Sequence, residues 1–183
     1  MLADQLLTLN DLLELLLAAN RPVGLAVELK HEEPQEGPAL EDAVLSVLGR
    51  RGWTPHRSRL ANVDVSFMSF DADAVGYLLD VVPGRYLCQL VDLEYEAGTE
   101  RLADGSVGIA GPGTDYLAAY PEQVRAWIAG GSRARVWAVD TAADLYASLA
   151  VGAQEITTDD PALIRSVLAG LPAVGPREPV GVG

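Results

Sequence analysis

The stretch VGLAVELK, residues 23–30, distinguishes between the folds open to this chain. Its side chains alternate between two faces, as they do in a β-strand. One face is apolar and carries Val23, Leu25, Val27 and Leu29, whereas the other is small, then charged, and carries Gly24, Ala26, Glu28 and Lys30. A central strand of a doubly wound sheet is covered by helices on both faces and is apolar on both. The alternation therefore favours a (β/α) barrel, whose interior accepts the small and charged face.

Strand-like and helical segments alternate along the rest of the chain. Further strands are predicted at 63–70, 86–91, 134–140 and from 155, and helices at 9–19, 38–51, 72–82, 121–129, 141–152 and 161–168. The glycine-rich residues 107–113 are interpreted as a brief extended piece and a turn. One helix followed by five strand–helix units predicts a parallel sheet covered by helices. We therefore predict an α/β fold, a partial TIM-like (β/α) barrel, with an open doubly wound sheet as the alternative.

The composition limits the partners and the domain count. The chain has 183 residues, with 13 Lys and Arg against 26 Asp and Glu, a net charge of −13. This acidic balance argues against nucleic acid or an anionic membrane surface as the main partner. Residues 1–170 are predicted to form one α/β domain, and the Pro- and Gly-rich residues 171–183 a disordered tail. The leucine-rich N-terminus is interrupted by polar and acidic residues, which predicts neither a signal peptide nor a membrane span and favours a cytoplasmic location.

Glu28 and Lys30 are the strongest candidates for functional residues. They are two residues apart, so both side chains point the same way at the carboxyl end of a strand, where α/β proteins collect functional groups. Lys30 is also the only lysine in the chain. Glu28 is interpreted as a ligand for a hard divalent cation, and Lys30 as a contact for an anionic oxygen such as that of a phosphate ester. A plain ion pair at a strand end is the alternative.

Trp137 and the two histidines complete the set of candidates. Trp137 lies in the strand-like run ARVWAVD and is interpreted either as a core aromatic or as a wall for the apolar part of a ligand. His31 and His56 are the only imidazoles, and both are expected on the solvated surface. The single cysteine, Cys88, can form no internal disulfide, so redox chemistry is not expected.

Several motifs occur together in a fixed order. They are LTLNDLLELL at 7–16, LAVELKH at 25–31, SF at 69–70, VWAVDTAADL at 136–145 and GAQEITTDDPALIRSVL at 152–168. In this order and spacing the chain resembles the glycerophosphodiester phosphodiesterases. The resemblance implies a (β/α) barrel that uses a divalent metal, Mg or Ca, to hydrolyse a small-molecule glycerophosphodiester to an alcohol and glycerol 3-phosphate.

The resemblance also implies roles for individual residues. Glu28 matches a carboxylate ligand of the metal, Lys30 the lysine that contacts the phosphate, and Trp137 an aromatic that lines the substrate pocket. Asp140 stands where the family often has Asn. Thr158, with the aspartate after it, matches the closing Thr-Asp turn, whose role is interpreted as structural.

The chain departs from the family at its beginning. Nothing in the sequence matches the first strands of the family, which carry two further metal carboxylates and the acid and base histidines, so the motifs cover strands four to eight only. This implies that the chain alone is inactive, with a weak or absent metal site. Its open sheet edges predict self-association or pairing with another chain. The alternative is a noncatalytic remnant or binding module for a phosphate-containing ligand or a partner chain.

Overall fold

A curved sheet of parallel strands runs through the computed structural model, which describes residues 7–31 and 37–171. The parallel strands are β1 (Val23–Glu28), β3 (Val63–Ser69), β4 (Leu87–Val91), β5 (Ile109–Pro112), β6 (Arg133–Val136) and β7 (Glu155–Ile156). A short strand, β2 (Arg59–Leu60), pairs antiparallel with the start of β3.

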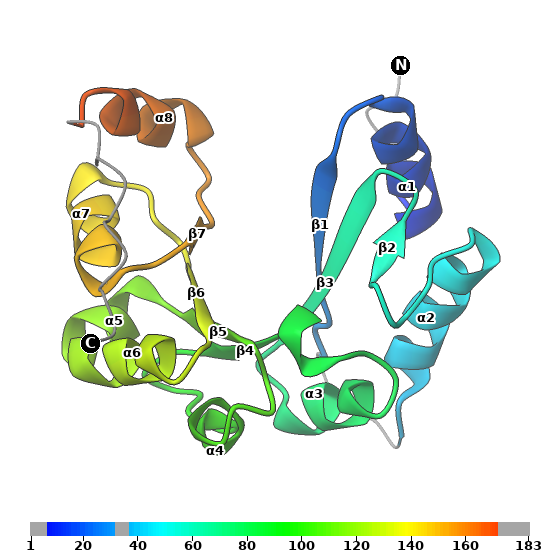
Figure 1. The fold of residues 1–183 in the computed structure, drawn as a ribbon, viewed down its shortest axis with the longest axis horizontal. Helices are drawn as coiled ribbons and strands as arrows, with labels where there is room; N and C mark the ends of the chain where they lie inside the picture. Colours follow the sequence, from blue (N-terminus) through cyan, green and yellow to red (C-terminus); the bar gives the residue numbers. More distant parts are fainter. Residues whose placement is uncertain (1–6, 32–36, 172–183) are drawn as a thin grey trace, which may run out of the picture.

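The order of the strands decides between the two predicted architectures. Each parallel strand lies beside the one before it in the chain, in the order β1-β3-β4-β5-β6-β7. A doubly wound sheet reverses its strand order at one point, and the described strands show no such reversal. The sheet instead curls, with β1 and β3 on one side and β6 and β7 on the other (Figure 1). The fold is therefore a partial TIM-like (β/α) barrel, as predicted, and the doubly wound alternative is excluded.

Helices connect the strands and lie on the convex side of the sheet (Figure 1). They are α1 (Leu9–Ala18), α2 (Ala39–Arg50), α3 (Ala72–Leu79), α4 (Thr99–Ala103), α5 (Thr114–Ala119), α6 (Pro121–Ala129), α7 (Ala142–Val151) and α8 (Pro161–Ala169), with a 3-10 turn, η1, at Gly84–Tyr86. Three of them begin at side-chain caps, which a sequence indicates where Ser, Thr, Asp or Asn stands just before a helical pattern. Thr8, Asp71 and Thr141 each accept a hydrogen bond from a backbone N–H in the first turn of the helix that follows.

The described residues form six parallel strands, one more than the five predicted. The additional strand is β5, at a position interpreted from its glycines as a brief extended piece and a turn. Gly111 lies so close to β4 that an added Cβ would be 2.7 Å from the Cys88 sulfur. The glycine at this position therefore permits close approach of two strands, a requirement that arises only once the strands have packed together.

The two faces of the sheet differ in what they bury. On β3, Val63, Val65 and Phe67 are fully buried in the main core with the helices, whereas the residues that alternate with them are more exposed. On β1, the half-buried positions alternate in the same way with the exposed Gly24, Ala26 and Glu28. On β1 and β3 the concave face is therefore the more exposed one, in agreement with the alternation in residues 23–30.

The strands at the two ends of the sheet, β1 and β7, each pair with one neighbour within the described residues. A closed TIM barrel has eight strands, so these residues supply six of them. No helix of this part of the chain is long and apolar enough to cross a membrane. The extent of the predicted domain stays a prediction, and the predicted tail lies, from residue 172 onward, outside the described residues.

Candidate functional site

A cavity of about 200 Å³ lies at the carboxyl ends of the strands, and it brings the three predicted site residues together. Glu28 and Lys30 come from the end of β1, and Trp137 follows β6 more than a hundred residues later. Apolar side chains from β3, β4 and the segment after β3 also line the cavity, namely Met68, Phe70 and Leu90. The lining therefore combines an ammonium, a guanidinium and a carboxylate with an apolar surface.

Glu28 and Lys30 form a loose ion pair at the mouth of this cavity. The Lys30 Nζ lies 3.6 Å from a carboxylate oxygen of Glu28, and the two side chains are 73% and 31% exposed. Solvent-exposed pairs of this kind contribute little to stability. The Lys30 ammonium is therefore accessible to a ligand.

Trp137 is held rigidly beside the cavity. Its indole N–H donates to the carbonyl oxygen of Gly111 at 2.8 Å, and Phe70 packs edge-on against its ring with 5.3 Å between ring centroids. Trp137 and Phe70 also pack against a small buried cluster, separate from the main core, of Cys88, Leu90 and Ile109. The ring thus presents a fixed apolar surface beside the cavity and is not a member of the main core.

Cys88 belongs to that small cluster and carries no reactive thiol. The side chain is fully buried, and this burial raises the pKa of the thiol to about 12. Because the thiolate is the nucleophilic form, the cysteine acts here as a small apolar residue.

Arg135 is a lining residue that the sequence reasoning missed. Its guanidinium donates to Glu155 at 2.6 Å and to the Ser66 hydroxyl at 3.1 Å, so it joins β6 to β7 and β3 across the concave face. Glu155 also accepts from Arg133 on the same strand as Arg135. The alternation in ARVW, which places Arg135 and Trp137 on one face, is the signal that could have found it.

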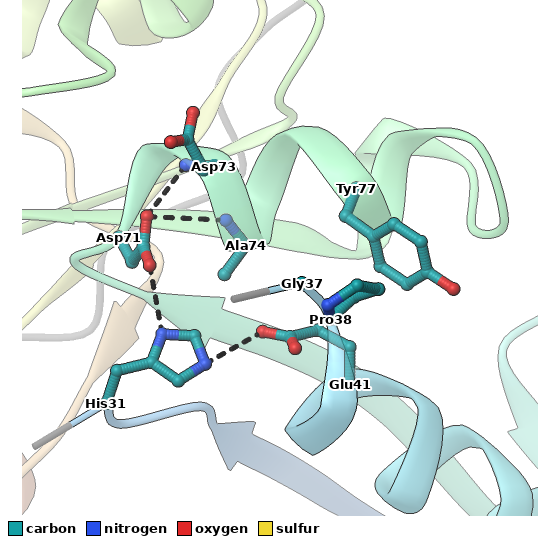
Figure 2. Close-up of a pocket in the computed structure, with 8 residues that line it drawn as sticks. All are labelled: His31, Gly37, Pro38, Glu41, Asp71, Asp73, Ala74 and Tyr77. Carbon is teal, nitrogen blue, oxygen red and sulfur yellow. Dashed lines mark hydrogen bonds and ion pairs between the residues drawn. The ribbon is translucent and has the colours of Figure 1, made fainter. Parts of the chain in front are cut away.

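His31 is not a solvated surface residue, and this expectation is wrong. Its ring is 14% exposed and lies between two carboxylates (Figure 2), with Nδ1 2.9 Å from Asp71 and Nε2 3.1 Å from Glu41. Since both ring nitrogens face carboxylates, neither is free to exchange a proton with a substrate. His56 is exposed, as predicted.

Comparison with known proteins shows which fold this is. No family model matches the sequence, and no curated protein matches it either. Among solved structures, a glycerophosphodiester phosphodiesterase from Parabacteroides distasonis matches with a TM-score of 0.69 at 20% identity, over 88% of this chain and 63% of that one. This chain carries part of the glycerophosphodiester phosphodiesterase fold.

Two further structures agree with this conclusion. An Oleispira antarctica phosphodiesterase in complex with the product sn-glycerol-3-phosphate matches with a TM-score of 0.59 at 20% identity, over 80% of this chain and 55% of that one. A glycerophosphodiester phosphodiesterase from Thermotoga maritima matches with a TM-score of 0.56 at 17% identity, over 79% of this chain and 56% of that one. The resemblance is thus confirmed in the fold, and the chain spans between 55% and 63% of the length of these three proteins.

The number of strands refines how much of the glycerophosphodiester phosphodiesterase barrel is present. Strands four to eight, as the motifs indicate, would be five strands, whereas the sheet contains six parallel ones. The number of strands predicted from the motifs is therefore one too low, because the residues of β5 were interpreted as a brief extended piece and a turn.

The described residues do not by themselves supply a full set of ligands for the divalent metal that the resemblance to glycerophosphodiester phosphodiesterases implies. Glu28 is a single carboxylate with the Lys30 ammonium beside it. Within residues 7–31 and 37–171, no group of three or more His, Cys, Asp or Glu side chains is placed to hold an ion. Mg and Ca require several oxygen ligands, so Glu28 can supply no more than one of a set.

The closing Thr-Asp turn of the motif contacts the strand end beside it. Asp140 accepts hydrogen bonds from the Thr158 hydroxyl at 3.0 Å and from the Asp159 N–H at 2.8 Å. These bonds join the segments that follow β6 and β7. They favour the interpretation of this turn as structural.

Proposed function

We propose that this chain forms the substrate-binding face of a glycerophosphodiester phosphodiesterase, which hydrolyses glycerophosphodiesters to an alcohol and glycerol 3-phosphate. One observation carries the proposal. Glu28, Lys30 and Trp137, each matched to a motif of that family, line a single cavity at the carboxyl ends of the strands, which is where TIM-barrel enzymes place their active sites.

Each of the three residues has a proposed role. The Lys30 ammonium contacts a phosphoryl oxygen as a point charge, and its exposure at the cavity mouth supports this role. Trp137 packs its fixed ring against the glycerol carbons. Glu28 contributes one carboxylate to a Mg or Ca site whose other ligands come from outside the described residues.

The full reaction, in this proposal, requires strands that the described residues do not supply. Six parallel strands out of the eight of a closed barrel, and matches that span 55% to 63% of the compared structures, support it. The missing strands would bring the remaining metal ligands and the acid and base groups. A role in lipid metabolism and the predicted cytoplasmic location belong to the same proposal.

A noncatalytic binding module is the second candidate. It is favoured by the single carboxylate at the cavity and by the engagement of both His31 ring nitrogens. In this case the chain binds a phosphate-containing ligand through Lys30 without hydrolysing it, or binds a partner chain through the edges at β1 and β7.

Two measurements distinguish the candidates. The first is hydrolysis of glycerophosphocholine with Mg or Ca, by this chain and by a version extended upstream to include the missing strands. The second is calorimetric binding of sn-glycerol 3-phosphate to this chain, compared between Lys30→Gln and the charge-matched control Arg57→Gln, which changes an exposed cation that does not line the cavity.

The expected result is hydrolysis by the extended chain alone, with binding by this chain that only Lys30→Gln weakens. Binding with no hydrolysis by either version would favour the binding module. An extended chain that neither binds nor hydrolyses would contradict both candidates, and full activity after Glu28→Ala would refute the role of Glu28.

A further inference from the structure

His31 directly follows Lys30, and its ring ties the end of β1 to two helices. Figure 2 shows the ring between Asp71, which caps the start of α3, and Glu41, in the first turn of α2. The three residues line a second hollow, on the side of these helices, that is distinct from the cavity containing Lys30. The ring therefore does not line the cavity described above, but it belongs to the segment that carries Lys30.

The contact with Glu41 has consequences because that carboxylate is buried. The Glu41 side chain is 1% exposed, and among the described residues its one ionic contact is His31, at 3.1 Å. No described group donates a well-aligned hydrogen bond to either of its oxygens. A buried carboxylate is costly without a partner, so loss of the imidazole would force Glu41 or its surroundings to rearrange.

The other ring nitrogen of His31, Nδ1, contacts Asp71. One oxygen of Asp71 accepts from the His31 ring, while the other accepts from the backbone N–H groups of Asp73 and Ala74 at the start of α3. The ring thus makes one hydrogen bond, to Asp71, and one close ionic contact, to Glu41. The His31 ring therefore connects α2 and α3 to the end of the segment that carries Lys30.

Backbone bonds fix the residue on the other side of Lys30. The Leu29 N–H donates to the Met68 carbonyl at 2.8 Å, and the Leu29 carbonyl accepts from the Ser69 hydroxyl at 2.7 Å. The Lys30 side chain is mostly exposed, with Glu28 as its one ionic contact in the described residues. The backbone therefore sets where the Lys30 side chain starts, and this backbone is held at Leu29 and at His31.

We propose that His31 is a positioning residue, which holds the Glu28–Lys30 pair at the mouth of the cavity through its contacts with Asp71 and Glu41. The inference rests on the proposed function only for the ligand that the pair binds. It assigns no proton transfer to the ring.

The test compares variants at the two ends of β1. His31→Phe keeps a ring of similar size and removes both nitrogens, and His31→Gln keeps one donor. The matched control is Asn62→Ala, which removes two side-chain hydrogen bonds to the carbonyls of Leu16 and Arg21 near the start of β1. Melting temperature, NMR signals of Glu28 and Lys30 without ligand, and calorimetric binding of sn-glycerol 3-phosphate are measured for each.

We expect His31→Phe and Asn62→Ala both to lower the melting temperature. Only His31→Phe should shift the Glu28 carboxylate and Lys30 ammonium signals, and it should weaken binding by about tenfold, the lower end of what loss of a ligand-orienting partner costs. His31→Gln should recover part of both effects. Should His31→Phe fail to fold, Glu41→Gln, which removes the charge of one partner, carries the same comparison.

The outcomes separate this inference from the proposed function. Shifted Glu28 and Lys30 signals in a protein that binds no sn-glycerol 3-phosphate would support positioning by His31 and contradict the proposed ligand. Unshifted signals with wild-type binding in His31→Phe would overturn the inference and leave the proposed function in place. Equal effects of His31→Phe and Asn62→Ala on the signals and on binding would also overturn it, because the role would then be general stabilisation.

Discussion

Two ion pairs on the concave face of the sheet have the same chemistry and opposite surroundings. At the mouth of the cavity, Lys30 lies 3.6 Å from Glu28 and is mostly exposed. Deeper in the face, Arg135 contacts Glu155 at 2.6 Å, with its side chain 10% exposed. The exposed pair leaves an ammonium free for a ligand, whereas the charges of the buried pair hold three strands together. The two cations differ most in exposure: the exposed Lys30 is the one proposed to bind a ligand, whereas the buried Arg135 joins strands.

Removal of the buried cation should have the largest effect on stability. Arg135→Ala leaves the carboxylate of Glu155 with Arg133 alone and breaks the bond to Ser66. Glu155 is 26% exposed and keeps its contact with Arg133, so the loss is that of hydrogen bonds from a charged donor, about 1.5–3 kcal/mol. Urea unfolding should therefore show a loss of this size for Arg135→Ala, and a loss below about 1 kcal/mol for Arg133→Ala, whose side chain is far more exposed. Equal losses for the two variants would remove the distinction between buried and exposed pairs.

Removal of the exposed cation should affect binding and leave stability nearly unchanged. Lys30→Gln is expected to change the free energy of unfolding by no more than about 0.5 kcal/mol. Because a hydrogen bond to a charged group contributes about 1.5–3 kcal/mol, the same variant should weaken binding of sn-glycerol 3-phosphate by about tenfold or more. Calorimetry and urea unfolding on one protein preparation measure both quantities. A variant that loses stability but not affinity would reverse the roles of the two pairs.

The His31–Asp71 contact extends the comparison to a partly exposed pair. Burial by itself would raise the pKa of Asp71, but hydrogen bonds from the Asp73 N–H, the His31 ring and the Ala74 N–H outweigh it and lower the pKa. A carboxyl group with a lowered folded pKa stabilises the fold above its unfolded pKa of about 3.9, and this contribution is lost as the pH falls through the folded pKa.

Asp71→Asn should therefore flatten the acid limb of the stability profile. Asparagine remains a good helix cap but does not titrate, so the variant should be less stable than the wild type at neutral pH and should approach it as the pH falls below about 4. Urea unfolding at a series of pH values measures the difference. Two profiles that run parallel across this range would show that the charge of Asp71 contributes nothing.

The Cys88 thiol should show the smallest effect of all. Because burial raises its pKa to about 12, iodoacetamide at pH 8 should not label the folded protein but should label it in denaturant. Mass spectrometry measures the label. Rapid labelling of the folded chain would show that the small cluster behind Trp137 opens to solvent.

Much of the fold could be predicted from local patterns. The alternation in residues 23–30 places Glu28 and Lys30 on one face of a strand, and the structure has them on the concave face. Thr8, Asp71 and Thr141 cap the helices that their positions predict. These features depend on periodicity and on residues three or four apart, which a single sequence displays directly.

The features that were missed depend on residues far apart in the chain. His31 meets Asp71 across 40 positions and Arg135 meets Ser66 across 69, and no local pattern announces either contact. At Gly111, the neighbouring glycine and proline residues favour a turn, whereas in the structure the glycine lets β5 pack closely against β4.

Side-chain periodicity was enough to specify a barrel-like face with a carboxylate, Glu28, and an ammonium, Lys30, at the carboxyl end of its first strand. The packing of distant segments decided which charges became buried, which histidine came to lie between two carboxylates, and how many strands joined the sheet. The physical reason is that burial and pairing are properties of the space between segments, and that space exists only after the chain has folded.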